Sequence, residues 1–298
     1  MQKCCAFLTM EDPSGYFVYD QLTHQPLASL GWRVVDVPWT KPIQPWAQFD
    51  AVVVRSPWDY QSNPDAFLTT LDSIEAAGAR LFNPAQICRW NIDKTYLRDL
   101  AEHGVPTIPT LWLNSFDRVE LESQFKSLEL SDSLVIKPTI GAGADNVFVL
   151  GLPQCTQWEK AAQVFRNRPL MVQPFLRSIV SLGEYSLFYF AGRFSHAIIK
   201  TPAKGDFRVQ EEHGGIIRSI EPNSEILAVG ERTLQAIDQQ LLYARVDIVQ
   251  LQDGSFAVIE LELIEPSLYF PYDDQSPRRF AEALNQMAGS LQKGERGI

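Results

Sequence analysis

The chain has little positive charge and no long apolar segment. Its 298 residues include 26 Lys and Arg against 36 Asp and Glu, which gives a formal net charge of −10. Nucleic-acid binding depends on Lys and Arg at the phosphates, so an acidic chain without a basic block is a poor candidate. No apolar run approaches the roughly 18 residues of a membrane-spanning helix. We therefore expect neither nucleic acid nor a membrane among its partners.

Cysteine and histidine are also scarce, with 4 of each. Cys4, Cys5, Cys88 and Cys155 lack zinc-type spacing, and so few thiols in a long chain favour a reducing compartment. We expect a cytoplasmic protein with buried or incidental thiols, and a catalytic cysteine is the less favoured alternative. His196 has apolar neighbours, which favours a hydrogen-bonded core histidine over a ligand.

The first 91 residues alternate strands with helices. We expect strands at residues 4–9, 32–37, 51–54 and 80–82, and helices at 19–30 and 64–77. Such alternation predicts a parallel sheet, whose ligands lie beyond the carboxyl ends of the strands. Arg55 and Ser56 follow the third strand directly, so we expect them to contact substrate. The alternative is a loop that only caps the sheet.

Two lysines further along occupy positions suited to phosphate. Lys94 lies near a helix start, and Lys137 ends a strand expected at 134–138. The loop after Lys137 contains Gly141 and Gly143, and backbone N–H groups in such a loop can approach phosphate oxygens. A buried lysine also needs an anion. The motif is not a Walker A loop, since the lysine precedes the glycines, and a solvated lysine or a tight turn is the alternative.

The remaining segments read as further strands and helices. We expect strands at 110–113, 146–149 and 170–173, helices at 118–127, 157–166, 224–241 and 277–288, a hairpin at 183–200 and a basic loop at 200–218. Gln173-Pro174-Phe175 leaves one of these strands. Because proline cannot continue a central ladder, this linker could offer free backbone groups to a purine edge.

A hairpin near the C-terminus concentrates charge. Asp253-Gly254 between two apolar, β-branched runs predicts the turn. Side chains alternate along a strand, so Arg245 shares a face with Asp247, and Glu260 shares a face with Glu262. If the two faces match, three carboxylates and a guanidinium converge. Clustered carboxylates repel unless a cation lies among them, and oxygen ligands without His or Cys favour Mg²⁺. Solvated acids on an exposed strand face are the alternative.

Glu265 is one residue out of step with Glu260 and Glu262. It would point away from the other acids unless the strand ends or bulges before it. Pro266 favours such an ending, in which case Glu265 and Ser267 face the substrate.

Taken together, these stretches resemble the ATP-grasp superfamily of ligases. The resemblance rests on the order of Asp93-Lys94, Ile136-Lys137-Pro138 with its glycine loop, Gln173-Pro174-Phe175, Gly183-Glu184, and the acids Asp247, Glu260 and Glu262. Within the superfamily, the chain is similar to the D-cycloserine synthase-like branch and, more distantly, to bacterial glutathione synthetases. Arg55-Ser56-Pro57-Trp58 and the stretch from Arg245 to Ser267 contribute to that closer likeness.

The resemblance implies an α/β (α+β) ATP-grasp fold. A parallel pre-ATP-grasp domain would span residues 1–91, and two α+β subdomains at 92–173 and 174–298 would clamp ATP. The residues implied to bind ATP are Lys94, Lys137, Gly141, Gly143, Gln173, Pro174, Phe175 and Glu184, the last at the ribose. Asp247, Glu260 and Glu262 would hold two Mg²⁺ ions, for which Mn²⁺ could substitute. Many relatives have Asn at the position of Glu262, so this site would carry one more negative charge.

The implied reaction is ADP-forming ligation of a carboxylate to an amine through an acyl-phosphate. The carboxylate would be small, such as an amino acid derivative or a short peptide. Lys200, Arg208 and Arg245 are the expected catalytic cations, since developing negative charge needs stabilisation. His213 and Gly214 join the expected substrate contacts. A protein-modifying ligase and a nucleotide-binding protein without turnover stay open as alternatives, and a homodimer is considered.

Overall fold

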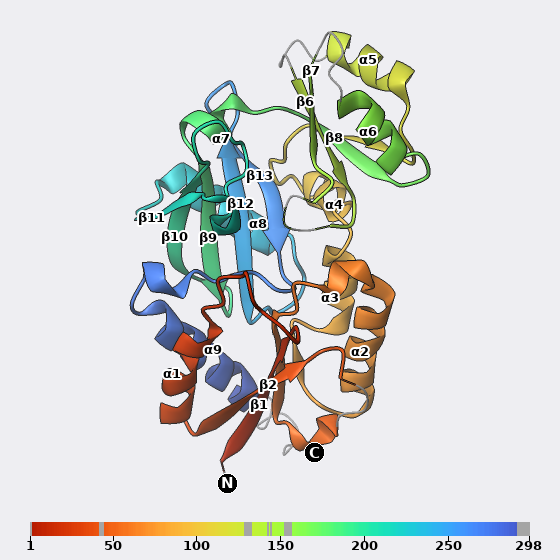
Figure 1. Ribbon diagram of the computed structural model, residues 1–298. Helices are drawn as coiled ribbons and strands as arrows, with labels where there is room; N and C mark the ends of the chain where they lie inside the picture. The colour runs from red at the N-terminus through yellow and green to blue at the C-terminus, as the bar shows by residue number, and fades with distance from the viewer. Residues whose placement is uncertain are drawn as a thin grey trace.

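The structure is a computed structural model that describes residues 2–41, 45–127, 133–141, 143, 145–151 and 157–290. It contains three sheets, and the third lies between the first, at the bottom of Figure 1, and the second, at the top. Within the described ranges, no helix has both the length and the apolar character needed to cross a membrane.

The first sheet is parallel, as expected. Its strands are β1 (Lys3–Thr9), β2 (Trp32–Pro38), β3 (Ala51–Ser56) and β4 (Leu81–Phe82), in the spatial order β2-β1-β3-β4. Its helices are α1 (His24–Ser29), α2 (Pro64–Ala76) and α3 (Ala85–Asn91), with a 3-10 turn η1 (Asp20–Thr23) before α1. Asn63 caps α2 by accepting from the N–H of Ala66, and Pro64 occupies its first turn, where no N–H partner is needed.

The second sheet is antiparallel. It consists of β5 (Leu111–Leu113), β6 (Ser133–Pro138), β7 (Phe148–Gly151) and β8 (Leu170–Pro174), in the order β5-β8-β6-β7. The helices of this part are α4 (Tyr96–Glu102), α5 (Arg118–Ser127) and α6 (Gln157–Val164). Along β6, Leu134 and Ile136 are buried in the core with Trp158. Alternation therefore places Lys137 on the opposite face.

The third sheet has five antiparallel strands. They are β9 (Glu184–Phe190), β10 (Arg193–Thr201), β11 (Ile216–Ile220), β12 (Tyr243–Gln250) and β13 (Phe256–Glu262), in the order β11-β10-β9-β12-β13. Helix α8 (Ser224–Gln235) contacts β12 and β13, and its Ile226 joins a core with Leu187 and Val246. Helix α7 (Arg177–Ser181) contacts β10 and β12.

Side chains from the first part of the chain hold the edge strand β13 and the backbone beside it. Asn91 donates to Leu261 O (2.9 Å) and accepts from Leu263 N (2.8 Å). Asn83 donates to Leu263 O (2.7 Å) and to Tyr243 O (2.9 Å). These bonds satisfy backbone groups that an edge strand leaves unpaired, so the position of the acidic hairpin is fixed.

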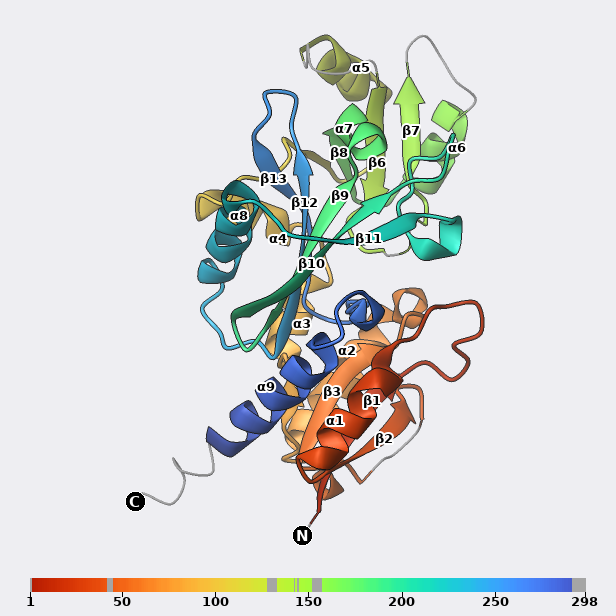
Figure 2. The ribbon, with the colours of Figure 1, turned by 90° about the vertical axis from the view of Figure 1, so that its left-hand side faces the viewer.

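The last helix, α9 (Ser276–Ser290), returns to the first sheet. Phe280 and Leu284 share a buried core with Phe7 and Leu27, and Figure 2 shows α9 beside α1. Phe190 of the third sheet belongs to the same core. The C-terminal part of the chain therefore joins two sheets, and the expected domain limits at residues 91 and 173 stay predictions.

Some expected elements differ from those observed. The helix expected at 224–241 ends at Gln235, and a turn leads from there into β12. Strand β11 begins within the segment expected to be a basic loop and extends beyond it, and no residue in it is fully buried, so it lacks the alternating pattern of a half-buried strand. Helix α7 was not expected and has no buried residue. Both are weakly apolar elements whose positions depend on tertiary contacts.

Candidate active site

A cavity of about 760 Å³ is lined by residues from all three parts of the molecule. The loops after β1 and β3 supply Tyr16, Phe17 and Trp58. The second sheet supplies Lys137 and Gln173, and the third sheet supplies Glu184, Lys200, Arg245, Glu260 and Glu262. Charged groups of both signs and aromatic rings therefore face one enclosed space, which is the usual composition of a ligand site.

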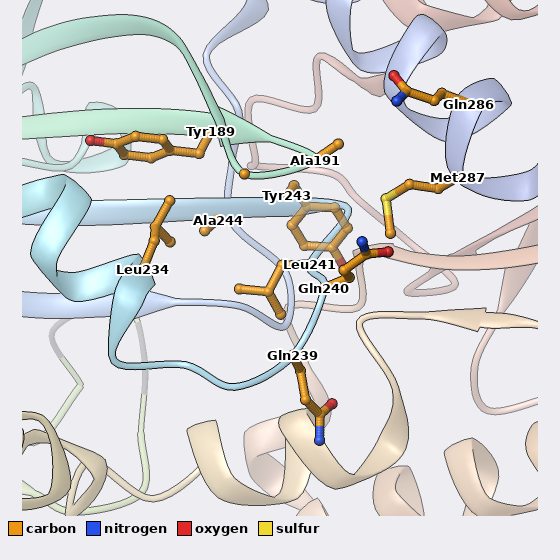
Figure 3. A pocket seen from close by; sticks show the side chains of 11 residues that line it. Tyr189, Ala191, Leu234, Gln239, Gln240, Leu241, Tyr243, Ala244, Gln286 and Met287 are labelled. Atoms are coloured by element: carbon orange, nitrogen blue, oxygen red, sulfur yellow. The ribbon is translucent and has the colours of Figure 1, made fainter. Parts of the chain in front are cut away.

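A second cavity, of about 280 Å³, lies at the opposite end of the third sheet (Figure 3). Leu234, Leu241, Tyr243 and Met287 line it, together with glutamines such as Gln239 and Gln286. None of its lining residues carries a charge. It offers no group for acid–base, metal or phosphate chemistry, so the larger cavity is the candidate active site.

The acidic hairpin forms one wall of the large cavity. Arg245 pairs with Glu262 and Asp247 pairs with Glu260 across β12 and β13, so the two predicted faces match. A bulge follows directly, where the register shifts between Asp247 and Ile248. One carboxylate oxygen each from Asp247, Glu260 and Glu262 can be chosen so that all lie within 4.8 Å of one another.

Three cations hold this acidic cluster together. Lys94 Nζ lies 2.7 Å from Glu260 Oε1. Lys200 forms ion pairs with Glu184 and, at 3.4 Å, with Asp247.

Arg245 is the third of these cations. Its guanidinium lies 3.0 Å from Asp247 and also pairs with Glu262. Ser186, which shares a face of β9 with Glu184, donates to Asp247. Each carboxylate of the cluster therefore has a cationic partner.

The cluster remains electrostatically strained. Burial and the neighbouring Glu260 and Asp247 raise the pKa of Glu262 to about 8, although Arg245 opposes the rise. Burial raises the pKa of Glu184 as well, against the effect of Lys200. A further cation among these oxygens would lower both values, because it favours the charged forms.

The ammonium group of Lys137 is unpaired within the described part of the chain. No ion pair or hydrogen bond of its side chain is found among the residues that the structure describes, and burial lowers its pKa. The side chain lines the cavity on the wall opposite the acidic hairpin. A desolvated ammonium group facing a cavity needs an anionic ligand.

Similarity to known proteins extends over most of the chain. Residues 5–83 match the family model for the N-terminal domain of D-cycloserine synthetase DcsG. The cycloserine biosynthesis protein DcsG of Streptomyces lavendulae is 32% identical over 250 residues, which cover 80% of this chain and 83% of that protein. The chain belongs to the ATP-grasp ligases. The crystal structure of D-cycloserine synthetase DcsG matches with a TM-score of 0.84 at 28% identity, covering 96% of this chain and 99% of that one.

The similarity to a more distant relative also extends over most of the chain. Glutathione synthetase of Ralstonia nicotianae is 23% identical over 259 residues, which cover 84% of this chain and 75% of that protein. The predicted fold class, the superfamily and the branch are therefore confirmed, and the chain is an ATP-dependent ligase. The roles of individual residues in this ATP-grasp ligase stay predictions.

The linker Gln173-Pro174-Phe175 does not leave its backbone groups as free as the sequence predicts. Strand β8 continues through Pro174, which pairs with Leu134 of β6. The N–H of Phe175 donates to Ser133 O at 2.9 Å, so this donor is occupied, whereas we had expected free backbone groups here. Gln173 donates to Thr110 Oγ1 at 3.0 Å. Gln173, Pro174 and Phe175 nevertheless line the cavity, beside Gly141 and Gly143.

Arg55 and Ser56 are not among the residues that line the cavity. Arg55 is only 1% exposed, pairs with Asp20 at 2.9 Å and donates to Pro266 O at 3.0 Å. All six residues of β3 are buried. The residues of this segment that line the cavity follow the strand and begin with Trp58. The cavity therefore does lie beyond the carboxyl end of β3, but the loop after the strand contacts it and the last residues of the strand do not.

His213 and Gly214 also lie outside the cavity lining. Gly214 adopts a left-handed conformation (φ 79°) that ends a short 3-10 turn, and His213 Nε2 lies 3.5 Å from Gly143 O. Arg208, on the same loop, does line the cavity. It is half-exposed and pairs with Asp206 at 2.7 Å.

Several residues in the cavity or in contact with its lining were not expected from the sequence. Tyr16 and Phe17, after β1, line the cavity. Tyr60, after β3, is hydrogen-bonded to Glu265, and Ser186 donates to Asp247. The signals were present: Tyr16 and Phe17 come after a parallel strand, and Ser186 alternates with Glu184. Glu265 and Ser267 line the cavity, because β13 ends at Glu262 and the alternation no longer applies.

His196 is a core histidine, as expected. It stacks on Phe188, Nδ1 lies 3.0 Å from Ser195 Oγ, and Nε2 donates to Leu268 O at 3.0 Å. Burial lowers its pKa to about 4. The unfolded chain therefore binds a proton that the folded chain excludes, so the contribution to stability is complete above the unfolded pKa of about 6.5 and is lost as pH falls.

We expect this loss to disappear in His196→Gln, whose amide does not titrate. The free energy of unfolding of the wild type should fall relative to that of the variant by roughly 3 kcal/mol between pH 6.5 and pH 4. Denaturant unfolding of both proteins across this range measures the difference. Parallel curves would mean that His196 is protonated in the folded protein.

Proposed function

We propose that this ATP-grasp ligase joins a small carboxylate to an amine through an acyl-phosphate, with ATP converted to ADP and phosphate. The carboxylate would come from an amino acid derivative or a short peptide. One observation carries the proposal: a half-buried Lys137, without a partner among the described residues, lines the same cavity as the acidic cluster of Asp247, Glu260 and Glu262. A triphosphate with a divalent cation complements both walls.

The acidic cluster fits Mg²⁺ by its chemistry. All three groups offer carboxylate oxygens, and the raised pKa of Glu262 indicates space for further positive charge. When bound, Mg²⁺ would supply positive charge that reduces the repulsion between the phosphates and the incoming carboxylate. We propose two ions, with Mn²⁺ as a substitute, held by Asp247, Glu260 and Glu262.

The chain's own residues would bind and orient the nucleotide. Lys137 and Lys94 would contact phosphates, beside the loop with Gly141 and Gly143. Lys94 now pairs with Glu260, and it would exchange part of that interaction for phosphate. Gln173, Pro174 and Phe175 would hold the adenine. Glu184 would hold the ribose hydroxyls through the oxygen that Lys200 leaves free.

Of the three predicted catalytic cations, the one with the fewest partners is best suited to stabilise negative charge at the reacting carbonyl. Each nitrogen of the Arg245 side chain already has an acceptor, and Lys200 is buried between two acids. Within the described ranges, Arg208 pairs only with Asp206, and it lines the cavity. We therefore favour Arg208 for stabilising the tetrahedral oxyanion, while Lys200 and Arg245 hold the acids in place.

Phosphate release tests the proposal directly. The protein, with ATP and Mg²⁺, is supplied with pools of amino acids and dipeptides, and phosphate is measured over time. We expect release only with particular pools. A protein that binds ATP yet releases no phosphate with any pool would instead be a nucleotide-binding protein or a ligase that modifies a protein, and addition of cell proteins as acceptors separates these two.

A further inference from the structure

The segment at residues 264–268, here called the strap, follows β13 and forms part of the cavity wall. Each of its five backbone carbonyls lies within hydrogen-bond distance of a different side-chain donor, and the single proton of the Tyr243 hydroxyl is shared with Val54 O at 2.9 Å. The donors are Tyr243 Oη to Ile264 O (2.8 Å), Trp58 Nε1 to Glu265 O (2.9 Å), Arg55 Nη2 to Pro266 O (3.0 Å), Arg245 Nη1 to Ser267 O (3.3 Å) and His196 Nε2 to Leu268 O (3.0 Å).

Such support is unusual for an irregular segment. Backbone carbonyls outside helices and strands are commonly satisfied by water, whereas these are held by side chains from β3, β10, β12 and the loop after β3. The donors fix the backbone and therefore the directions of the strap's side chains. Glu265 and Ser267 both face the cavity. Rigid support of this kind is what a binding group needs to hold a ligand in one geometry.

Glu265 differs from the other carboxylates of the site. Glu184, Asp247, Glu260 and Glu262 each form an ion pair with Lys or Arg. Glu265 is only 9% exposed, yet it has no ion pair within the part of the chain that the structure describes. A carboxylate buried without a cation is costly, so a cation from the ligand would relieve that cost.

We propose that Glu265 is the site that binds the cationic amino group of the substrate, held in position by the strap. This inference rests on the proposed ligase function and names the substrate class: a molecule that carries an ammonium group beside its reacting group. Burial raises the pKa of Glu265 to about 7, and the nearby Tyr60 hydroxyl opposes the rise. A bound ammonium group would favour the charged carboxylate, so binding should weaken below pH 7.

The cavity around Glu265 suits such a ligand. Trp58 lines the same cavity and donates to the strap, and Tyr16 lies against Trp58 with ring centroids 5.4 Å apart. Aromatic faces attract ammonium groups and exclude water from the pair. Arg55, which does not reach the cavity, acquires a role here as a positioning residue for the carbonyl of Pro266.

The test compares ligands that differ only in the ammonium group. Alanine is paired with lactate and serine with glycerate, in both enantiomers, with ADP and Mg²⁺ present. Binding is measured by the shift in melting temperature over a concentration series. For the wild type we expect the amino compound of at least one pair to bind roughly 10- to 100-fold more tightly, as expected for a hydrogen bond between charged groups.

Glu265→Gln should abolish this preference, and Glu265→Asp, which keeps the charge, should retain part of it. Glu102→Gln, on an exposed helix position, is the matched control and should bind as the wild type does. Equal binding of amino and hydroxy compounds by the wild type, or a preference that survives in Glu265→Gln, would overturn the proposal. Because binding is measured without turnover, this result is independent of whether phosphate is released in the ligase assay.

Discussion

Glu260→Gln is expected to lower phosphate release by about 1,000-fold or more, because a bound metal supplies several kcal/mol of charge stabilisation and each 1.4 kcal/mol is a factor of ten in rate. Glu260 belongs to the only group of three acids that could hold a metal ion within the described residues. It also pairs with Lys94 at 2.7 Å. One substitution therefore removes a charged metal ligand and the negative charge that pairs with a proposed phosphate-binding lysine.

The loss of activity should result from weaker metal binding and not from a loss of folded structure. Glu260 is half-buried at a sheet edge, and glutamine keeps its size and the oxygen that accepts from Lys94. The pKa of Glu260 is lowered, because Lys94 and Lys137 outweigh the effect of burial, so the charged form is the native one. Loss of that charge should weaken Mg²⁺ binding, which titration of Mg²⁺ in the presence of ADP measures separately from turnover.

Glu282→Gln provides the matched control, since Glu282 is an exposed residue of α9 whose ion pair within the described residues is with Arg278. It should retain wild-type rates and melting temperature. Unchanged phosphate release by Glu260→Gln would show that the metal assignment is wrong. A fall in melting temperature without any change in Mg²⁺ affinity would assign Glu260 a purely structural role with Lys94.

The acidic hairpin could be predicted from the sequence because its information is local. Alternation along two strands and a two-residue turn signal fix which side chains share a face, and the observed pairing of Asp247 with Glu260 follows from them. The parallel first sheet is likewise a consequence of alternating elements. These features depend on residues close together in the chain.

The strap could not be predicted in this way. Its carbonyls are held by side chains that lie up to about 200 positions away, such as Arg55 and Trp58 with Pro266 and Glu265. No local pattern states that Arg55 turns inward to a carbonyl and not outward to a ligand. The amide of Phe175 is a similar case, since its acceptor belongs to another strand. Motif order located the site, but tertiary contacts decide which atoms remain free for ligands.

Lys137→Met is expected to weaken ATP binding by at least about 100-fold, since two hydrogen bonds between charged groups contribute roughly 1.5 to 3 kcal/mol each. Lys137 has no partner among the described residues and faces the cavity. Its ammonium group would therefore direct its donors to phosphate oxygens. Nucleotide affinity can be measured by calorimetry with a non-hydrolysable ATP analogue and Mg²⁺.

The same substitution should not destabilise the empty protein. Burial lowers the pKa of Lys137, which means that the folded state disfavours the charged side chain at neutral pH relative to the unfolded state. Methionine fills a similar volume without a charge, so the melting temperature without nucleotide should stay constant or rise. Lys160→Met, at an exposed position of α6, is the control for loss of one positive charge.

Nucleotide affinity falls without a fall in melting temperature only if Lys137 binds a ligand. A structural lysine would lose stability on substitution and leave nucleotide affinity unchanged, whereas a solvated lysine would change neither. Lower affinity together with an unchanged or higher melting temperature identifies a group kept in an unfavourable environment for function. The position of Lys137 opposite Asp247, Glu260 and Glu262 then defines where the phosphates lie between the second and third sheets.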